Sequence, residues 1–214
     1  MAQAFSTRAV LALKLGFIGA LAAVAVIWLT LRADVGPMQE EPVQQSVPFS
    51  HKHHVADDGI DCRYCHTTVE TAAFAGVPPL STCMSCHSQL YTQQPPLRPL
   101  IDAWEGGPAL RWQRVHQLPG FVYFDHGIHV AKGVGCSSCH GQVDRMPLTW
   151  RSASLQMAWC LDCHRHPEKV LRGADQVFDM SWHPPADQAV RGRQLLAQYH
   201  IDKARLTECS ICHR

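Results

Sequence analysis

The stretch Cys136-Ser137-Ser138-Cys139-His140 is one of five copies of the motif C-x-x-C-H in this chain of 214 residues. The other copies lie at residues 62–66, 83–87, 160–164 and 209–213, and the five together contain all ten cysteines. In this motif two cysteines three positions apart form thioether bonds to the vinyl groups of one haem, and the next histidine ligates its iron. The sequence therefore predicts five covalently bound haem c groups, held by haem motifs 1 to 5 in chain order.

Each predicted haem uses two thiols and one proximal histidine. The thiols belong to Cys62, Cys65, Cys83, Cys86, Cys136, Cys139, Cys160, Cys163, Cys209 and Cys212. The proximal iron ligands are His66, His87, His140, His164 and His213. Zinc sites and disulfides also use paired cysteines, but neither needs a histidine directly after each pair. The repetition therefore favours haem.

The amino-terminal segment is predicted to cross a membrane. Residues 15–31 carry no charge, and this apolar run is long enough for one spanning helix. A cleaved signal peptide is the alternative, but the best cleavage point, after Ala33, lacks the small residue that such sites need upstream. Arg8 and Lys14 precede the span, so the positive-inside rule places the amino terminus in the cytoplasm. We expect the haem domain on the outer, periplasmic face of a bacterial cell membrane.

Three regions follow from this organisation. Residues 1–34 form the cytoplasmic start and the anchor, residues 35–47 form a linker rich in Pro, Gln and Glu, and residues 48–214 form the pentahaem domain. Because five macrocycles must supply most of its core, we expect short helices and loops wrapped around porphyrins. The formal net charge of +1 gives no reason to expect a nucleic-acid partner.

The pattern F-x-H-x-x-H occurs twice, at residues 49–54 and 124–129, each time ahead of a haem motif. These two histidine modules supply the predicted distal iron ligands His51, His54, His126 and His129. The second histidine of each module lies a short loop ahead of a motif, so we expect it to cap the haem of that motif. The first histidine is then free to reach a neighbouring haem. His53 is the alternative to His54.

A fifth distal ligand is harder to choose from the sequence. The candidates are Met157, which lies three residues before Cys160, and also Met146, His116, Met180, His183 and His200. We narrowly favour Met157. Methionine as an axial ligand would raise the potential of that haem above those of its bis-histidine neighbours. The alternative is that this methionine only packs. The last haem, close to the carboxyl end, is expected at an edge of the domain.

The anchor, the five motifs, the two histidine modules and the segments VHQLPGFVYFDHGIHV (115–130) and MAWCLDCHRHPE (157–168) resemble the pentahaem cytochrome c subunit of alternative complex III. The histidine modules are shared with small class III multihaem cytochromes. The resemblance implies a class III-like fold and a subunit that passes electrons from a quinol-oxidising module to a cytochrome c or an oxidase. It implies as partners an iron-sulfur subunit, polytopic quinol-site subunits and a monohaem cytochrome c.

Two other functions stay open at this point. One is an anchored quinol dehydrogenase of the tetrahaem type, and the other is a multihaem reductase. A reductase needs an iron with an open distal position, whereas all five motifs here end in histidine and enough distal ligands exist to close every iron. The residues therefore favour electron relay without a separate active site.

Overall fold

The computed structural model describes residues 6–32 and 39–213. Residues 33–38, which contain the cleavage point weighed after Ala33 and the first part of the predicted linker, lie outside the described residues. The chain divides into two units, the first ending at Val35 and the second beginning at Gly36. This division falls one residue after the predicted end of the anchor region.

The first unit contains one long helix, α1 (Thr7–Arg32). Its span from Thr7 to Thr30 is long and apolar enough to cross a membrane. Apolar side chains lie on every side of it, and the large ones from Val10 to Leu29 are exposed. A helix that is hydrophobic all round has no polar face to turn toward water, so this pattern suits a lipid environment. By length and composition α1 can therefore serve as a membrane anchor.

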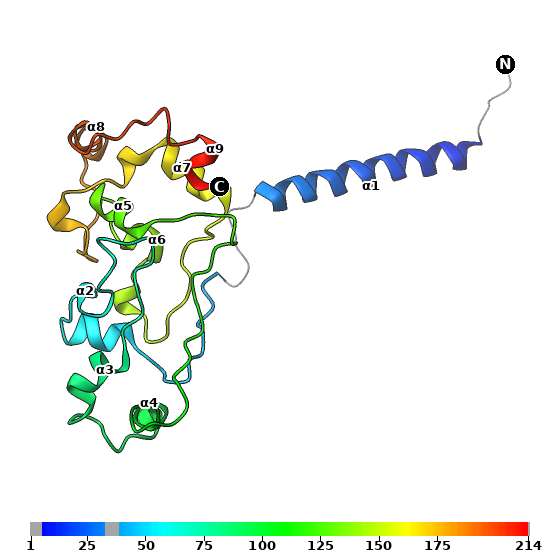
Figure 1. Cartoon of the computed structure of the whole chain (residues 1–214). Coiled ribbons are helices and arrows are strands. Elements are labelled where there is room, and N and C mark those ends of the chain that lie inside the picture. Colours follow the sequence, from blue (N-terminus) through cyan, green and yellow to red (C-terminus); the bar gives the residue numbers. More distant parts are fainter. Residues whose placement is uncertain (1–5, 33–38, 214) are drawn as a thin grey trace. The chain divides into compact units, whose positions relative to one another are not determined.

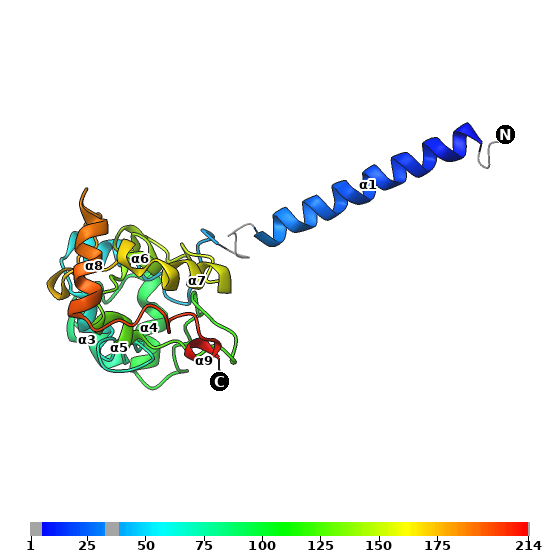
Figure 2. The same cartoon turned by 90° about the horizontal axis from the view of Figure 1, so that it is seen from above.

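The second unit, called the haem unit below, consists of short helices joined by long irregular segments (Figures 1 and 2). Its α-helices are α2 (Cys62–Cys65), α3 (Leu80–His87), α4 (Arg98–Trp104), α5 (His126–Ala131), α6 (Ser137–His140), α7 (Met157–Arg165), α8 (Gln188–Gln198) and α9 (Cys209–Cys212). Its other helical turns are η1 (Lys52–Asp57), η2 (Pro95–Leu97), η3 (Val143–Arg145), η4 (Pro167–Lys169) and η5 (Ala174–Gln176). In the described residues, β-structure is limited to three isolated bridges. The predicted architecture of short helices and loops is confirmed.

The protein's own hydrophobic core is small for a unit of this size. Among the described residues nine hydrophobic side chains are buried, and one cluster, centred on Val47, Met84 and Leu100, joins the start of the unit to α3 and α4. Met146 and Leu171 are buried elsewhere. A chain of this length normally buries a larger apolar interior. A small protein core of this kind is expected of a domain whose interior is completed by apolar prosthetic groups.

The carboxyl-terminal part is held together by close backbone packing. Gln188 in α8 donates through Nε2 to the carbonyls of Glu168 and Leu171, both at 2.8 Å. Gly192, one turn further along α8, lies directly against the Glu168 carbonyl, where a Cβ atom would clash. α8 therefore fixes the segment that follows motif 4.

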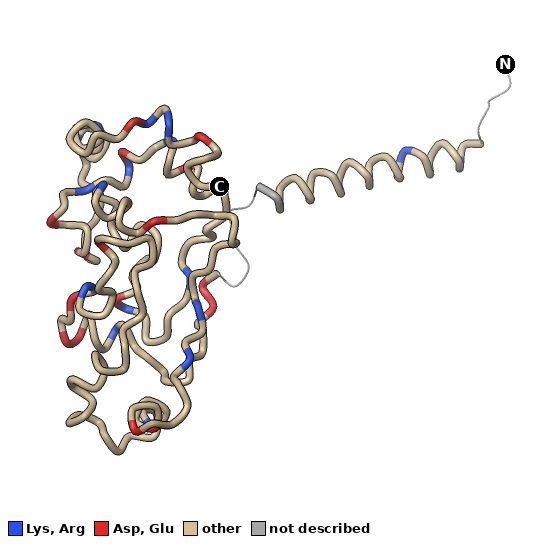
Figure 3. The backbone as a smooth tube through the Cα atoms, viewed as in Figure 1, with Lys and Arg blue, Asp and Glu red and all other residues tan. Residues whose placement is uncertain are grey.

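Basic and acidic residues are interspersed along the haem unit (Figure 3).

Candidate functional site

All five haem motifs coincide with helical turns, in α2, α3, α6, α7 and α9. Residues three positions apart lie on the same face of a helix, so each turn presents its two thiols to one side. All ten cysteines are free thiols. Within the described ranges, no three or more His, Cys, Asp or Glu side chains gather as they would around a metal ion. The donors are therefore arranged two thiols at a time, as haem attachment requires, and not as four-cysteine zinc sites or disulfides.

Three pairs of imidazole rings face one another across a gap. The ring centres are 6.1 Å apart for His54 and His87, 6.4 Å for His126 and His140, and 6.2 Å for His129 and His164. With a metal–nitrogen bond of about 2.1 Å and about 1.1 Å from nitrogen to ring centre, two imidazoles on opposite sides of one iron have centres about 6.4 Å apart. Each pair therefore has the separation needed to hold one haem iron.

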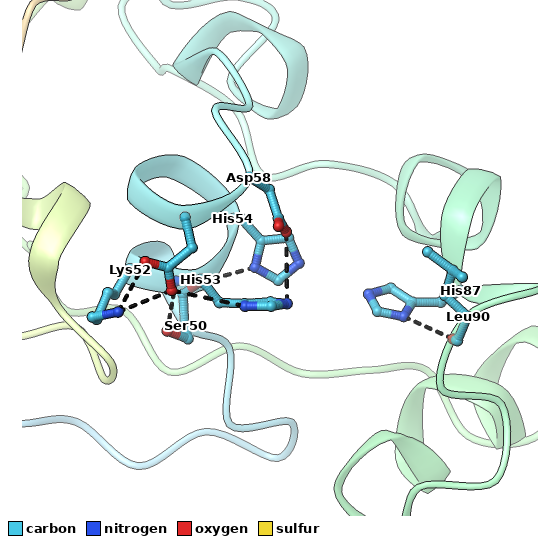
Figure 4. Close-up of polar contacts among 8 residues, drawn as sticks. Ser50, Lys52, His53, His54, Asp58, His87 and Leu90 are labelled. Atoms are coloured by element: carbon cyan, nitrogen blue, oxygen red, sulfur yellow. Dashed lines mark hydrogen bonds and ion pairs between the residues drawn. The ribbon is translucent and has the colours of Figure 1, made fainter.

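Figure 4 shows the His54 and His87 pair, with His54 supplied by η1 and His87 by α3. His53, the alternative in register, faces two carboxylates: its Nδ1 lies 4.0 Å from Asp57 and its Nε2 3.6 Å from Asp58. Both of its ring nitrogens are thus directed at acidic side chains. The structure favours His54 as the ring opposite His87.

Hydrogen bonds fix the orientation of these rings. The Nδ1–H groups of four of the five proximal histidines donate to backbone carbonyls: His66 to Gly76 at 2.8 Å, His87 to Leu90 at 3.2 Å, His164 to Leu206 at 2.7 Å and His213 to Phe121 at 3.3 Å. In the modules, His54 donates to Ser50 at 2.9 Å, His126 to Ala73 at 2.9 Å and His129 to Asp125 at 2.6 Å. A carbonyl can only accept, so the proton is on Nδ1 and the Nε2 lone pair is left for a metal. The donor set therefore fits haem iron.

The two histidine modules have the same internal geometry. In the first, the Phe49 ring stacks on His54 with centres 4.5 Å apart and meets His51 edge-on at 4.9 Å. In the second, Phe124 makes the corresponding contacts at 4.5 and 4.8 Å. The phenylalanine thus orients both histidines of its module. It was part of the sequence pattern, but the sequence gave no reason to assign it this role.

The pairing differs from the register expected from the sequence. His54 was expected to cap motif 1 and His129 to cap motif 3, but each faces the proximal histidine of the following motif, in motifs 2 and 4. His126, the first histidine of its module, faces motif 3 instead. The reason is that a helical turn directs its two histidines to different neighbours, so proximity along the chain does not select the haem. Each second histidine therefore bridges to the later motif.

His51 is expected to serve motif 1, by analogy with the second module. Its Nδ1 lies 2.9 Å from the Thr149 hydroxyl. Burial, with a smaller contribution from the charge of the nearby His66, lowers the pKa of His51 to about 4. His51 holds the same position in the first module as His126 in the second, and His126 faces His140. By this repeat, His66 is the proximal histidine expected opposite His51.

The candidates for the fifth distal position are placed very differently. Met146 and Met180 are buried in the protein core. His116 packs edge-on against His140, with ring centres 4.3 Å apart. Met157, at the start of α7, is 66 % exposed. Among the methionines that the structure describes, Met157 is the exposed one, and no described contact joins it to His213.

Neighbouring motifs also contact one another directly. The Tyr64 hydroxyl in motif 1 lies 2.9 Å from the Ser85 hydroxyl in motif 2. Motif 3 is linked to motif 1 through residues 177–178: Cys136 N donates to Val177 O, and the Arg63 guanidinium lies 4.5 Å from the centre of the Phe178 ring. These contacts place motif 1 between motifs 2 and 3.

Motif 3 rests on a buried arginine that the sequence analysis missed. Arg172 is 2 % exposed, and its Nη2 donates to the hydroxyls of Ser137 at 3.2 Å and Ser138 at 3.1 Å. The Trp182 ring covers the guanidinium at 3.9 Å. Burial raises the pKa of Cys139 to about 12, with nearby thiolate charges adding to it. Nothing in the local sequence connects a distant arginine with the two residues inside a C-x-x-C pair.

The comparisons with known proteins agree with this geometry. Residues 122–214 match the family model described as cytochrome c7 and related cytochrome c. The chain is also similar to the menaquinone reductase multiheme cytochrome c subunit of Nitratidesulfovibrio vulgaris, with 31 % identity over 125 residues. That match covers 58 % of this chain and 57 % of the relative, so the chain spans little more than half the length of the relative. Together with the short helices and loops, the match over residues 122–214 indicates a cytochrome c7-like multihaem fold for the haem unit.

Proposed function

We propose that this protein is a membrane-anchored pentahaem cytochrome that relays electrons within a quinone-linked oxidoreductase complex. The observation that carries the proposal is the set of three imidazole pairs separated by 6.1 to 6.4 Å, each of which includes the proximal histidine of one haem motif. Haem c, when bound, supplies one-electron redox chemistry at each iron. The chain holds the thiols, orients the imidazoles and shields them from water. Five motifs support five haem groups.

The proposal assigns no separate catalytic site to the chain. Motifs 2, 3 and 4 each have a histidine ring opposite the proximal one, and His51 takes this place for motif 1. We assign Met157 as the distal ligand of His213 in motif 5. An iron with protein ligands on both faces has no position for a substrate, so these motifs suit electron transfer between neighbours better than reduction of a bound oxyanion.

The two similarities suggest two kinds of partner complex, which differ in the direction of electron flow. Resemblance to the pentahaem subunit of alternative complex III supports electron flow from a quinol-oxidising module, with an iron-sulfur subunit and polytopic subunits, to a cytochrome c or an oxidase. The relative's description as a menaquinone reductase subunit supports the second candidate, in which the haems deliver electrons toward a quinone. We favour the first because two long segments of the chain carry that resemblance.

Membrane attachment through α1 supports either complex. We propose that the amino terminus is cytoplasmic and that the haem unit lies on the outer face of the cell membrane, because Arg8 and Lys14 precede the apolar span. Residues 35–47 would then connect the anchor to the haem unit.

Purification of the full chain from its native membrane in mild detergent tests these alternatives. Co-purifying iron-sulfur and polytopic subunits, with haem reduction on addition of quinol, would support the alternative complex III role. Haem oxidation on addition of menaquinone, without reduction by quinol, would favour the second candidate. A solitary protein that oxidises quinol would contradict both and support an anchored dehydrogenase.

A further inference from the structure

The haem unit contains a partly buried arginine, Arg151, with two guanidinium nitrogens that lack a partner. Among the described residues, the Nε and Nη2 atoms of Arg151 are shielded from solvent and have no hydrogen-bond acceptor, and His116 Nε2 is likewise buried without a partner. Arg172 has one such atom, Nε, but its other guanidinium nitrogens donate to two serine hydroxyls and the Asp179 carbonyl, and the Trp182 ring covers it. Arg151 therefore presents two adjacent donors without an acceptor, whereas Arg172 presents one.

These donors lie among the histidines of motifs 1 and 3. His116 packs against His140 at 4.3 Å, and its charge influences His51. Burial and, to a smaller extent, the positive charge of Arg151 together lower the pKa of His116 to about 4. Arg151 therefore places a positive charge near His116.

The backbone holds Arg151 at this position. Its carbonyl accepts a hydrogen bond from Glu40 N at 2.8 Å, and Gln39 forms a parallel bridge with it. Gln39 Nε2 also donates to the Ser152 carbonyl at 2.7 Å. The guanidinium is thus carried by a segment tied to the start of the haem unit, and it is not a freely moving surface side chain.

Shielded donors of this kind need an acceptor. Leaving them unpaired is costly, and two adjacent N–H groups on the guanidinium fork match the two oxygens of one carboxylate. No Asp or Glu in the described ranges forms an ion pair with Arg151, and Asp144 Oδ1, which is also buried without a partner, makes no hydrogen bond with it. A carboxylate from outside the protein chain would complete the site.

We propose that Arg151 binds a propionate carboxylate of the haem at motif 1 or motif 3 through Nε and Nη2, with His116 Nε2 beside the same group. This inference rests on the proposed attachment of haem at those motifs. Arg151 is a positioning residue: it fixes the edge of one macrocycle and places a positive charge beside it. A nearby cation favours the reduced form, so Arg151 raises the potential of that haem.

The test compares Arg151→Gln with Arg151→Lys in the full haem-loaded chain, and Arg191→Gln is the matched control. Arg191 lies on α8, is exposed and pairs with Asp187. Haem content by mass spectrometry confirms five attached groups before redox titration followed by absorption. In Arg151→Gln we expect the reduction equilibrium of one haem to fall about fivefold to tenfold, where tenfold equals about 59 mV for one electron. Lysine should restore part of the shift, because it keeps the charge but not the fork.

Unchanged potentials in a fully loaded Arg151→Gln protein would overturn the proposal, as would equal shifts in the control. If the reduction potential of that haem in the wild-type protein changes with the concentration of added phosphate, the site binds an anion from solution, and the proposal is also overturned. Replacing Cys62 and Cys65 with alanine separates the two haems: if the Arg151→Gln effect persists, the propionate belongs to motif 3, and if it vanishes, to motif 1. Loss of haem from all variants and from the wild type would instead refute the proposed function.

Discussion

Replacing His129 with alanine tests the arrangement of distal ligands most directly. The ring centre of His129 lies 6.2 Å from that of His164, close to the separation of about 6.4 Å expected across one iron. We therefore expect His129→Ala to open the distal face of the haem at motif 4 and no other. Since motif 4 is one of five, about a fifth of the haem iron should become high-spin while the rest stays low-spin.

The assay is electron paramagnetic resonance of the oxidised protein, repeated in a chain whose Cys160 and Cys163 are both alanine. Without a haem at motif 4, His129→Ala should add no high-spin signal. His53→Ala is the matched control, because His53 neighbours a module histidine but faces carboxylates. If the high-spin signal survives removal of the motif 4 haem, His129 caps a different iron, such as that of motif 3, and the pairing derived from ring geometry is refuted.

Three further predictions concern other parts of the chain. Asp61 caps α2, and its hydrogen bonds with Arg63 hold the pKa of the carboxyl below its usual range. Asparagine caps a helix equally well, so Asp61→Asn should remove only the ion pair with Arg63, at a cost of about 0.5–1 kcal/mol of unfolding free energy near neutral pH. This difference should vanish in denaturant titrations as the pH falls through the lowered pKa. Trp182→Leu removes the ring at 3.9 Å from the Arg172 guanidinium and should lower the unfolding free energy by about 1–2 kcal/mol, whereas Trp182→Phe should recover part of it, as measured by the same titrations. Replacing residues 1–34 with a cleavable secretory signal peptide should move a fully haem-loaded unit to the soluble fraction after cell lysis, and retention in washed membranes would show that α1 is not what holds it there.

The sequence was sufficient to predict the motifs and the general architecture. Thioether attachment depends on residues within one helical turn, so the spacing of Cys62, Cys65 and His66 carries that information locally. The short helices of the haem unit follow from the same spacing, because each turn is an attachment site. The apolar composition of residues 15–31 was likewise enough to predict a long helix.

Distal pairing could not be read from the sequence because it depends on tertiary contacts. Tyr64 and Ser85 bring motif 2 beside motif 1, and only then can His54 face His87. A count of residues between a module and the next motif measures chain length and not direction. The Arg172 contact with Ser137 spans 35 positions for the same reason. A methionine ligand such as Met157 has no spacing signature, so its assignment stays a prediction.

The paired geometry explains why each histidine module has two histidines three positions apart. In the second module, His126 faces His140 and His129 faces His164, so one short helix, α5, contributes to two consecutive motifs. The relative placement of the two sites then depends on a single rigid turn and not on a flexible loop. Electron transfer between neighbours requires a fixed, short separation, and a shared turn provides it without a large protein core. A change that bends α5 should therefore disturb motifs 3 and 4 together, whereas a change at one proximal histidine should disturb its own motif first.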